Sequence, residues 1–554
     1  ILGGGGIYNQ NGILTVKNSV ISNNIATGNN SGCSGGGIYN GGRLTLINST
    51  VNGNSSYVTG GGNGGGIYND VNSSFTVIGS TISNNTAEQM EGGGVYSRNG
   101  VTTTITNSNI SNNRSWGGGG IYNLSGALNI AGSTFTNNTL LPGFSAANGG
   151  AILNNAGMVF VSNSNFNGNA AAGGGAIANS GTTNITNTTF SGNSAFNGTG
   201  GAIANTGTLI LTDLIISGNS AAATTNFEGA RGGGISGGGT TTANRVTIQN
   251  NSANSGGGVY LKTGNHSFIN STISGHSVSG QGAGIYCEAA TVGLTNSTIS
   301  NNTTTNVGGG IYNFGSSNLT LTNTTVNNNR ADLAGGVFNQ FLATANARNA
   351  IIADNTNVTT SSNTAPDYFG TLGSLGYNLI ENLSNTTITG ITTGNILGQD
   401  PQLMTLRSNG GPTNTIALQP TSPAIDAGDP NNFPATDQRG VARPQDGDLN
   451  GNARSDIGAY ERQVFTSTVT KIADTNDGVC DGDCSLREAI AITNAATTPD
   501  NAIVFDPTVF SQPQIITLTL GELRVNGNRT LVIYGGGANM LTISGSNQSR
   551  VLYV

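Results

Sequence analysis

Charged side chains are scarce in this sequence. Asp, Glu, Lys and Arg make up only 8% of its 554 residues, and no basic run occurs anywhere. This argues against a nucleic-acid or anionic-membrane partner, because both recruit clustered positive charge. No apolar run approaches the 18 residues of a membrane-spanning helix. Only four cysteines are present, and Cys480 and Cys484 are the only two that are close in sequence.

Glycine is abundant instead, with 88 residues, and Asn, Ser and Thr fill much of the remainder. Such a composition can indicate disorder. Here, however, 35% of the residues are hydrophobic, and they recur at fixed offsets. The phrase Gly-Gly-Gly-Ile-Tyr-Asn at 64–69 returns, identical or close, 13 times at a mean spacing of about 27.5 residues. We anchor each copy on the apolar residue after the glycines: Ile7, Ile38, Ile67, Val95, Ile121, Ile152, Ile177, Ile203, Ile235, Val259, Ile285, Ile311 and Val337.

A second phrase follows each anchor except the last: a bulky apolar residue, two others and then Asn, as in Ile82 to Asn85. One copy ends in His276 instead. Between the two phrases the residues alternate, as in Leu44-Thr-Leu46, which indicates a strand. Three short strands with Gly and Asn corners form one turn of a parallel β-helix. We predict an all-β solenoid of about 13 coils, on the order of 60 Å long, with corner amides stacked along its axis.

The residue after each anchor should point outward, and it is usually aromatic. One interpretation is an aromatic strip that binds sugars or a neighbouring rod; the other is a ladder that stiffens the sheet. The insertion-bearing corner, with long loops at Cys33, 140–144 and 225–228, is either a binding face or a site of tolerated drift. The candidate ligand-binding tyrosines are Tyr8, Tyr39, Tyr68, Tyr96, Tyr122, Tyr260, Tyr286 and Tyr312.

The paired phrases resemble the repeats of the polymorphic outer-membrane protein family. Gly149-Gly-Ala-Ile152 with Phe166 to Asn169 is a close match. The resemblance covers roughly residues 3–355 and implies a right-handed, surface-exposed and adhesive β-helix. We take residues 1–399 as this domain.

Residues 400–462 resemble the choice-of-anchor Q domain of bacterial secreted proteins. Four phrases match in order: 409–413, 422–428, 437–440 and 456–461. We expect a cap over the open end of the stack, where strand edges would otherwise be unpaired. Within it, oxygen-bearing residues at alternate positions of a Gly turn are typical of the start of a calcium loop, although Ile457 stands where such a loop has Glu. The alternative is an Asx-rich turn. The candidate calcium ligands are Asp446, Asp448, Asn450, Asn452 and Asp456.

Residues 463–554 contain Cys484-Ser-Leu-Arg-Glu-Ala489 and resemble the CSLREA domain, which usually opens secreted bacterial β-helix proteins. Ser485 and Glu488 form a capping box, so we predict a helix to about Ala496. Cys480 and Cys484 suit a disulfide in an oxidising compartment and make only a weak zinc site. Strands follow at 515–520, 530–534, 541–544 and 551–554, and they read as the start of another β-helix.

This order of parts suggests a segment of a longer chain of modules: stack, cap, opening domain and next stack. A β-helix enzyme that acts on polysaccharides needs clustered acids or bases. Here His266 and His276 read as surface or corner substitutes, Asp213 has no neighbouring acid, and Arg348 and Asp354 have no partner cluster. Cys33 and Cys287 lie about nine coils apart, roughly 43 Å, too far to pair.

We therefore predict a non-enzymatic structural or adhesive protein of the bacterial cell surface or extracellular space, built from tandem β-helix units. Its expected partners are further copies or modules end to end, or a surface polysaccharide; calcium is the only candidate cofactor. The alternatives are a carbohydrate-binding surface protein and a polysaccharide lyase or hydrolase.

Overall fold

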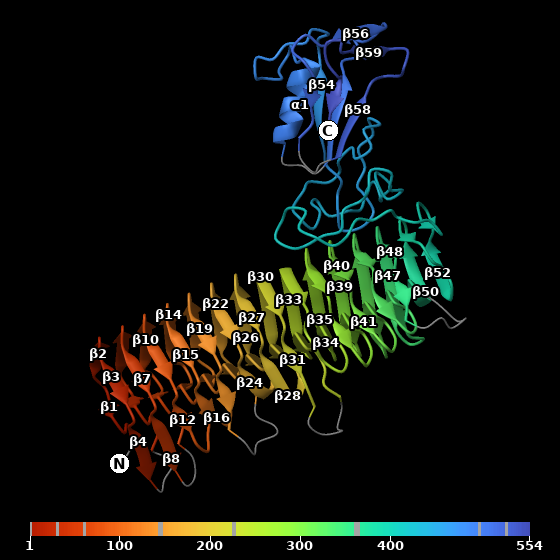
Figure 1. Cartoon of the computed structure of the whole chain (residues 1–554). Coiled ribbons are helices and arrows are strands. Elements are labelled where there is room, and N and C mark those ends of the chain that lie inside the picture. The colour runs from red at the N-terminus through yellow and green to blue at the C-terminus, as the bar shows by residue number, and fades with distance from the viewer. Residues whose placement is uncertain are drawn as a thin grey trace. The chain divides into compact units, whose positions relative to one another are not determined.

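The computed structural model describes residues 3–28, 33–58, 62–141, 148–223, 229–358, 366–496, 500–526 and 530–554 (Figure 1). Two compact units are present. The first comprises Ile1–Arg443 with Ile457–Tyr460, and the second comprises Pro444–Asp456 with Glu461–Val554. The long insertion loops at 140–144 and 225–228 lie mostly or entirely outside the described residues.

The first unit is a stack of coils in which every strand pairs, in parallel, with its equivalent one coil away. A typical coil contains β9 (Ile67–Asn69), β10 (Ser74–Ile78), β11 (Thr81–Ser83) and β12 (Thr86–Ala87). Ile67 pairs with Val95, and Tyr68 with Tyr96, so the sequence repeat is also the pairing register. The predicted solenoid is confirmed.

The strands fall into four series, one for each side of the coil. The first series is β1 (Ile7–Asn9), β5 (Ile38–Asn40), β9, β13 (Val95–Ser97), β17 (Ile121–Asn123), β21 (Ile152–Asn154), β25 (Ile177–Asn179), β29 (Ile203–Asn205), β32 (Ile235–Gly237), β34 (Val259–Leu261), β38 (Ile285–Cys287), β42 (Ile311–Asn313), β46 (Val337–Asn339) and the start of β50 (Tyr368–Leu375). The second is β2 (Ile13–Lys17), β6 (Arg43–Ile47), β10, β14 (Thr102–Thr106), β18 (Ala127–Ala131), β22 (Met158–Ser162), β26 (Thr182–Thr186), the first halves of β30 (Thr208–Ser217) and β33 (Thr240–Gln249), β35 (Asn265–Ile269), β39 (Thr291–Thr295), β43 (Asn318–Thr322) and β47 (Thr344–Arg348). The third is β3 (Val20–Ser22), β7 (Thr50–Asn52), β11, β15 (Asn109–Ser111), β19 (Thr134–Thr136), β23 (Asn165–Asn167), β27 (Thr189–Ser191), the second halves of β30 and β33, β36 (Thr272–Ser274), β40 (Thr298–Ser300), β44 (Thr325–Asn327) and β48 (Ile351–Ala353). The fourth is β4 (Ile25–Gly28), β8 (Ser55–Val58), β12, β16 (Arg114–Ser115), β20 (Thr139–Leu140), β24 (Ala170–Gly173), β28 (Ser194–Thr199) and β31 (Ser220–Ala221), followed by β37 (Ser277–Val278), β41 (Thr303–Thr304), β45 (Arg330–Ala331) and β49 (Thr356–Asn357).

The glycines of the repeat phrase are needed where coils approach most closely. Gly64 has a φ of +69°, a conformation that side-chain-bearing residues rarely adopt. A Cβ on Gly65 would lie 2.4 Å from the carbonyl oxygen of Thr86 and 2.6 Å from that of Gly93. The Gly triplet is therefore a close backbone crossing between coils and not a phosphate-binding loop.

Aliphatic and phenylalanine side chains fill the interior along the whole stack. The anchors Ile67, Val95 and Ile121 have no exposed surface. Phe135, Phe166 and Phe190 stack with ring centroids 4.7 and 4.8 Å apart. Burying a side chain of this size contributes about 1.5–3 kcal/mol, and each coil repeats that contribution against both neighbours.

Asparagine has two separate roles at the corner after the third strand. The first residue of a pair, such as Asn137, takes the left-handed conformation at φ +54°, a place that Gly168 and Gly192 fill in later coils. The second residue of the pair, such as Asn138, points inward and is completely buried. The predicted left-handed corners and stacked amides are thus confirmed, but different residues provide them.

The inward residues form one continuous column that we call the asparagine ladder. The backbone N–H and Nδ2 of Asn138 both donate to Oδ1 of Asn169, at 3.0 Å each, and Nδ2 also donates to the carbonyl of Ile110. The same pattern, with His276 in one place and a carboxylate at the end, runs through Asn24, Asn54, Asn85, Asn113, Asn138, Asn169, Asn193, Asn219, Asn251, His276, Asn302, Asn329, Asn355 and Asp367.

Two shorter ladders support other corners. Asn40 donates Nδ2 to Oδ1 of Asn69 at 2.7 Å, and equivalent bonds join later copies of the repeat phrase. Ser49 donates its backbone N–H to Oγ of Ser80 at 3.0 Å. Many neighbouring coils are therefore joined by buried polar bonds at more than one corner, in addition to strand pairing.

The stack extends beyond the 13 coils that the repeat spacing predicts. Tyr368 of β50 pairs with Val337 of the preceding coil. One coil further on, β52 (Thr386–Ile391) pairs with β50, and β53 (Ile396–Leu397) pairs with β51 (Leu379–Ile380). The described residues of both units together make about 19 turns. The estimate of 13 coils for the first stack is too low, because its last coils lack the Gly-rich phrase but keep the inward apolar positions, such as Leu372 and Ile380.

Residues 400–443 and 457–460 lie along one side of the stack, beside β40 and β48 (Figure 1). Gln438 donates Nε2 to Oγ1 of Thr272, at 2.8 Å, and accepts from Oγ1 of Thr298. The end coil keeps Ile391 53% exposed. The expectation that this segment closes the end of the stack is therefore wrong. Its hydrogen-bonding partners are outward-facing side chains on the side of the stack. We call it the side cover.

The second unit has three parallel strands, β54 (Val464–Val469), β55 (Asp500–Phe505) and β58 (Thr530–Tyr534), and helix α1 (Leu486–Ala495). Two further parallel pairs join β56 (Gln514–Thr517) to β59 (Leu541–Ser544), and β57 (Leu523–Arg524) to β60 (Leu552–Tyr553). The predicted helix and opening strands are confirmed. Among the described residues no helix is long and apolar enough to cross a bilayer.

His276 makes the asparagine ladder sensitive to acid. Its Nδ1 accepts from the backbone N–H of Asn251, and its Nε2 donates to the carbonyl of Ile248. Burial lowers the pKa of this imidazole to about 4. The neutral ring is favoured in the folded state, so its stabilisation is complete above pH 6.5 and is lost as pH falls toward 4.

We predict that His276→Asn raises the free energy of unfolding at pH 4 by about 3 kcal/mol and changes it by less than about 1 kcal/mol at pH 7. Urea unfolding followed by circular dichroism at both pH values checks this. The reciprocal variant Asn85→His should gain acid sensitivity. Equal pH dependence of wild type and His276→Asn would contradict the prediction.

Candidate functional sites

The first five tyrosines of the proposed strip stack on one another. Successive ring centroids from Tyr8 to Tyr122 are 4.7, 5.4, 5.3 and 5.0 Å apart, with interplanar angles of 2° to 19°. Tyr8 is 49% exposed, whereas Tyr68 and Tyr96 are only 8% exposed. The ring faces that a sugar would stack on are occupied by neighbouring tyrosines, so edges and hydroxyl groups are what this column presents.

Asp70 joins the tyrosine column across coils through one hydrogen bond and one ion pair. The Tyr39 hydroxyl contacts Asp70, and Arg98 bonds Asp70 at 2.8 Å. Burial, helped by the Asp70 charge, raises the pKa of Tyr68 to about 12, so its hydroxyl stays protonated. This geometry favours the interpretation as a stiffening ladder; sugar binding by the column remains a prediction.

The later tyrosines form a tilted cluster instead of a flat stack. Tyr260 and Tyr286 meet at 78°, and Tyr312 is tilted by 59° from Tyr286. The guanidinium of Arg231 lies 4.9 Å above the Tyr260 ring and bonds Glu288 at 3.0 Å. All three rings are buried, so this part of the strip is also internally satisfied.

The predicted calcium loop folds as an Asx-rich turn. Asp446 Oδ1 and Asp448 Oδ1 accept the backbone N–H of Asn450, and Asp446 Oδ2 accepts that of Gly451. Asn450 Oδ1 accepts the N–H of Asn452. These oxygens bond the turn itself, and Asp456 instead accepts from the N–H of Arg462. Calcium binding here stays a prediction.

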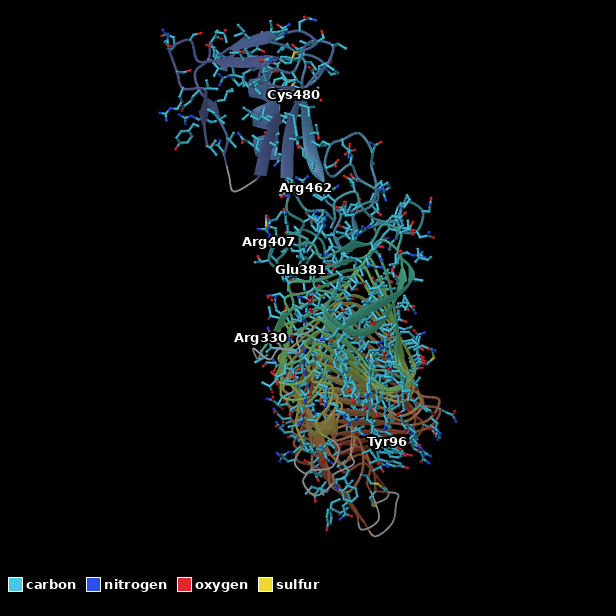
Figure 2. All side chains as sticks on the ribbon, turned by 90° about the vertical axis from the view of Figure 1, so that its right-hand side faces the viewer. Tyr96, Arg330, Glu381, Arg407, Arg462 and Cys480 are labelled. Carbon is cyan, nitrogen blue, oxygen red and sulfur yellow. A yellow bond between two sulfur atoms is a disulfide. The ribbon has the colours of Figure 1, made fainter. Side chains whose placement is uncertain are left out.

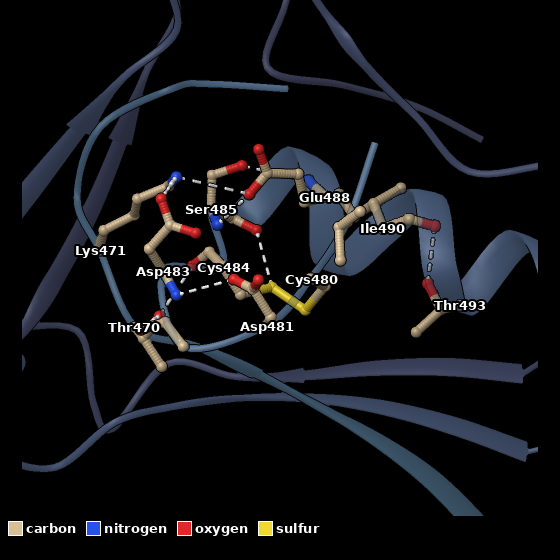
Figure 3. The surroundings of a disulfide bond; sticks show 12 residues. Thr470, Lys471, Cys480, Asp481, Asp483, Cys484, Ser485, Glu488, Ile490 and Thr493 are labelled. Atoms are coloured by element: carbon tan, nitrogen blue, oxygen red, sulfur yellow. Dashed lines mark hydrogen bonds and ion pairs between the residues drawn. A yellow bond between two sulfur atoms is a disulfide. The ribbon is translucent and has the colours of Figure 1, made fainter. Parts of the chain in front are cut away.

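Cys480 and Cys484 form a disulfide next to the start of α1 (Figure 3). Ser485 Oγ accepts the N–H of Glu488 at 3.2 Å, while Glu488 Oε2 accepts the N–H of Ser485 at 2.7 Å. This is the predicted capping box. The two sulfur atoms are bonded to each other and so are not zinc ligands in this state, and Cys33 and Cys287, both buried, are not joined to each other.

The sequence predicts that the two histidines are either surface residues or substitutes at a corner. The structure shows that neither is a surface residue. His266 and His276 are only 4% and 1% exposed. His276 occupies an Asn position of the ladder, so its interpretation as a corner substitute is supported. His266 Nε2 contacts the carbonyl of Thr263 at 2.7 Å, on a different side of the coil.

Two side-chain contacts cannot be recognised from neighbouring residues in the sequence, because the partners lie one coil apart. Asp213 forms a two-point ion pair with Arg245, at 2.6 and 2.7 Å. Asp354, which the sequence leaves without a partner cluster, has carboxylate oxygens within 4.8 Å of those of Glu381 and Asp400. The absence of a cluster around Asp354 is therefore a wrong prediction. Only the coil register could have revealed these neighbours.

This acidic group lines a pocket of about 500 Å³ near the end of the stack, where Figure 2 labels Glu381. Asp367 also lines it, and burial raises the pKa of its carboxyl to about 7. Burial, with the charges of Glu381 and Asp400, raises the pKa of Asp354 to about 6. The Asp354 carboxyl is therefore partly protonated near neutral pH, a property shared by general acids.

A second groove, of about 450 Å³, runs across three coils at the corner between the third and fourth strands. Exposed amides of Asn84, Asn112 and Asn137 line it together with Thr86 and Thr139. Arg114, at its centre, is exposed and forms no ion pair among the described residues. The groove offers hydrogen-bond donors, acceptors and one uncompensated positive charge.

A family model described as a right-handed β-helix region matches residues 65–235. The match lies inside the stack and agrees with its parallel register, so this is a right-handed parallel β-helix protein. No curated protein matches the chain. The resemblances of residues 400–462 and 463–554, and that of the repeats to outer-membrane proteins, remain predictions.

We predict that Asp354→Asn stabilises the end of the stack at pH 8 by about 1 kcal/mol, with no gain at pH 4. The raised pKa means that folding favours the protonated acid, so its contribution is present at pH 4 and is lost as pH rises through 6. Asn also suits the φ of +56° at this position, as at Asn328.

Hydrogen exchange of peptides covering 366–397, corrected for intrinsic rates, measures this change. Glu88→Gln, which removes an exposed carboxyl several coils away, is the control and should leave the exchange unaltered. The prediction would be contradicted if Asp354→Asn and the wild type show the same protection from exchange at both pH values. The charge of Asp354 would then not destabilise the end of the stack.

Proposed function

We propose that this chain is a non-enzymatic structural and adhesive module of an extracellular fibre or large surface protein built from tandem β-helix units. The observation that carries the proposal is the asparagine ladder, which repeats one buried contact in every coil from Asn24 to Asp367. A column of this kind resists the opening of any single coil, because each amide is bonded to the coils on both sides.

The charged side chains support the same proposal. Asp70 with Arg98, Asp213 with Arg245, and Arg231 with Glu288 each join neighbouring or nearby coils. These six ionisable groups are thus engaged in coil-to-coil contacts, which supports a mechanical role for them.

Electron microscopy of native material with a gold-labelled antibody against the coil repeats tests this proposal. We expect extended fibres that carry label at a regular axial interval. Antibody pre-absorbed with the purified chain is the control. Dispersed particles the size of one chain would contradict the fibre, and release of products from a panel of acidic polysaccharides would replace it with the enzyme alternative, centred on the group of Asp354.

A carbohydrate-binding surface protein is the second candidate, and the Arg114 groove favours it. Side-chain amides and hydroxyls match the hydroxyl groups of a glycan, and a lone guanidinium suits a carboxylate or sulfate. The groove crosses three coils, about 10 Å between the outer two, which is the length of two sugar residues.

On this alternative we predict binding to uronate-containing or sulfated glycans on an array, weakened at least tenfold by Arg114→Gln. Arg43→Gln, which removes another exposed guanidinium from β6, is the matched control and should bind like the wild type. Equal binding by both variants would exclude the groove as the site.

A further inference from the structure

The outward residues of the third strand series form a strip that is covered in one part of the stack and open in the rest. In coils 10 to 12 the first outward residues are Thr272, Thr298 and Thr325, each at most 1% exposed. In coils 2 to 9 the equivalent positions are half-buried or exposed. We call these the open strip: Thr50, Thr81, Asn109, Thr134, Asn165, Thr189, Ile215 and Thr247.

The covered part shows what these hydroxyls bind. Thr272 Oγ1 donates to the carbonyl of Asn414 at 2.6 Å and accepts from Nε2 of Gln438. Thr325 Oγ1 accepts the N–H of Ala459 at 3.0 Å. The same column therefore both donates and accepts when a polypeptide lies on it. The open strip continues this interface in register, because Thr247 pairs directly with Thr272.

Charge is absent from the open strip although the chain as a whole carries −7. The second outward column beside it, from Asn52 through Ser191 to Gln249, is also uncharged. Two negatively charged copies can approach each other here without placing like charges in contact. A partner recognised by charge would find no counter-charge on either column.

Spacing selects the partner further. Equivalent residues recur at each coil, about 4.8 Å apart, so the open strip extends roughly 34 Å. A surface with the same axial repeat can place a donor or acceptor opposite every coil over that length. A second copy of this chain has that repeat. The open strip contains no aromatic side chain on which a sugar ring could stack, so it does not favour a glycan as the partner.

We infer that the open strip is the lateral contact between two copies of this chain, which pair side by side over coils 2 to 9. This rests on the proposed structural role and adds the surface through which stacks associate. The side cover occupies the same columns in coils 10 to 13, so it limits the contact to the open part.

Sedimentation velocity of the full chain over a range of concentrations tests this inference. The wild type should show a concentration-dependent dimer. Thr134→Arg with Thr189→Arg puts like charges into the open strip, and we expect the dimer dissociation constant to rise at least tenfold. The matched control, Asn129→Arg with Asn184→Arg, places the same charges in the same two coils on one outward column of β18 and β26 and should dimerise like the wild type.

Circular dichroism of both double variants must match the wild type, which separates loss of contact from loss of fold. The inference would be overturned if the wild type stays monomeric. It would also be overturned if the open-strip double variant dimerises like the wild type while the control double variant does not. Binding of a glycan or an unrelated protein abolished by the strip variant alone, without any dimer, would overturn it as well. End-to-end fibres in native material together with a monomeric purified chain would leave the proposed function standing while the lateral contact fails.

Discussion

The structure depends on the bond between a side-chain amide and the same amide one coil away. An inward Asn is costly to bury unless all its donors and acceptors are used. Here Oδ1 of Asn169 accepts twice from Asn138, and its Nδ2 donates to Asn193 and to the carbonyl of Phe135. Satisfaction requires neighbouring coils in strict register, so the ladder and the parallel sheet specify each other.

This constraint explains why much of the fold is readable from the sequence. The interval between repeat phrases is the interval between pairing partners, as Ile67 and Val95 show. The Gly-rich phrase ends before the stack does, because β50 and β52 keep the apolar pattern without it. The position of the side cover cannot be read in the same way, because unpaired strand edges at the end of the stack also favour a cover there.

The candidate sites were less predictable for the same geometric reason. Residues distant in sequence become neighbours at the coil repeat: Asp213 meets Arg245, and Asp354 meets Glu381. Contacts between residues that are close in sequence are predictable, as the capping box of Ser485 and Glu488 shows. The tyrosine phrase predicts a column, but the stacking of its rings on one another depends on their side-chain orientations and is visible only in the structure.

Asp367 gives the asparagine ladder a direction and an end. Every rung before it donates toward the next coil, whereas both oxygens of Asp367 accept, from Asn355 and from the backbone of Asn382. An acid in place of an amide differs by one group, O for NH₂, and lacks the Nδ2 group with which the amide rungs donate. Replacing NH₂ by O at this one position thus gives the column a last rung that differs chemically from the amide rungs before it and bonds the backbone of Asn382 instead of another side chain.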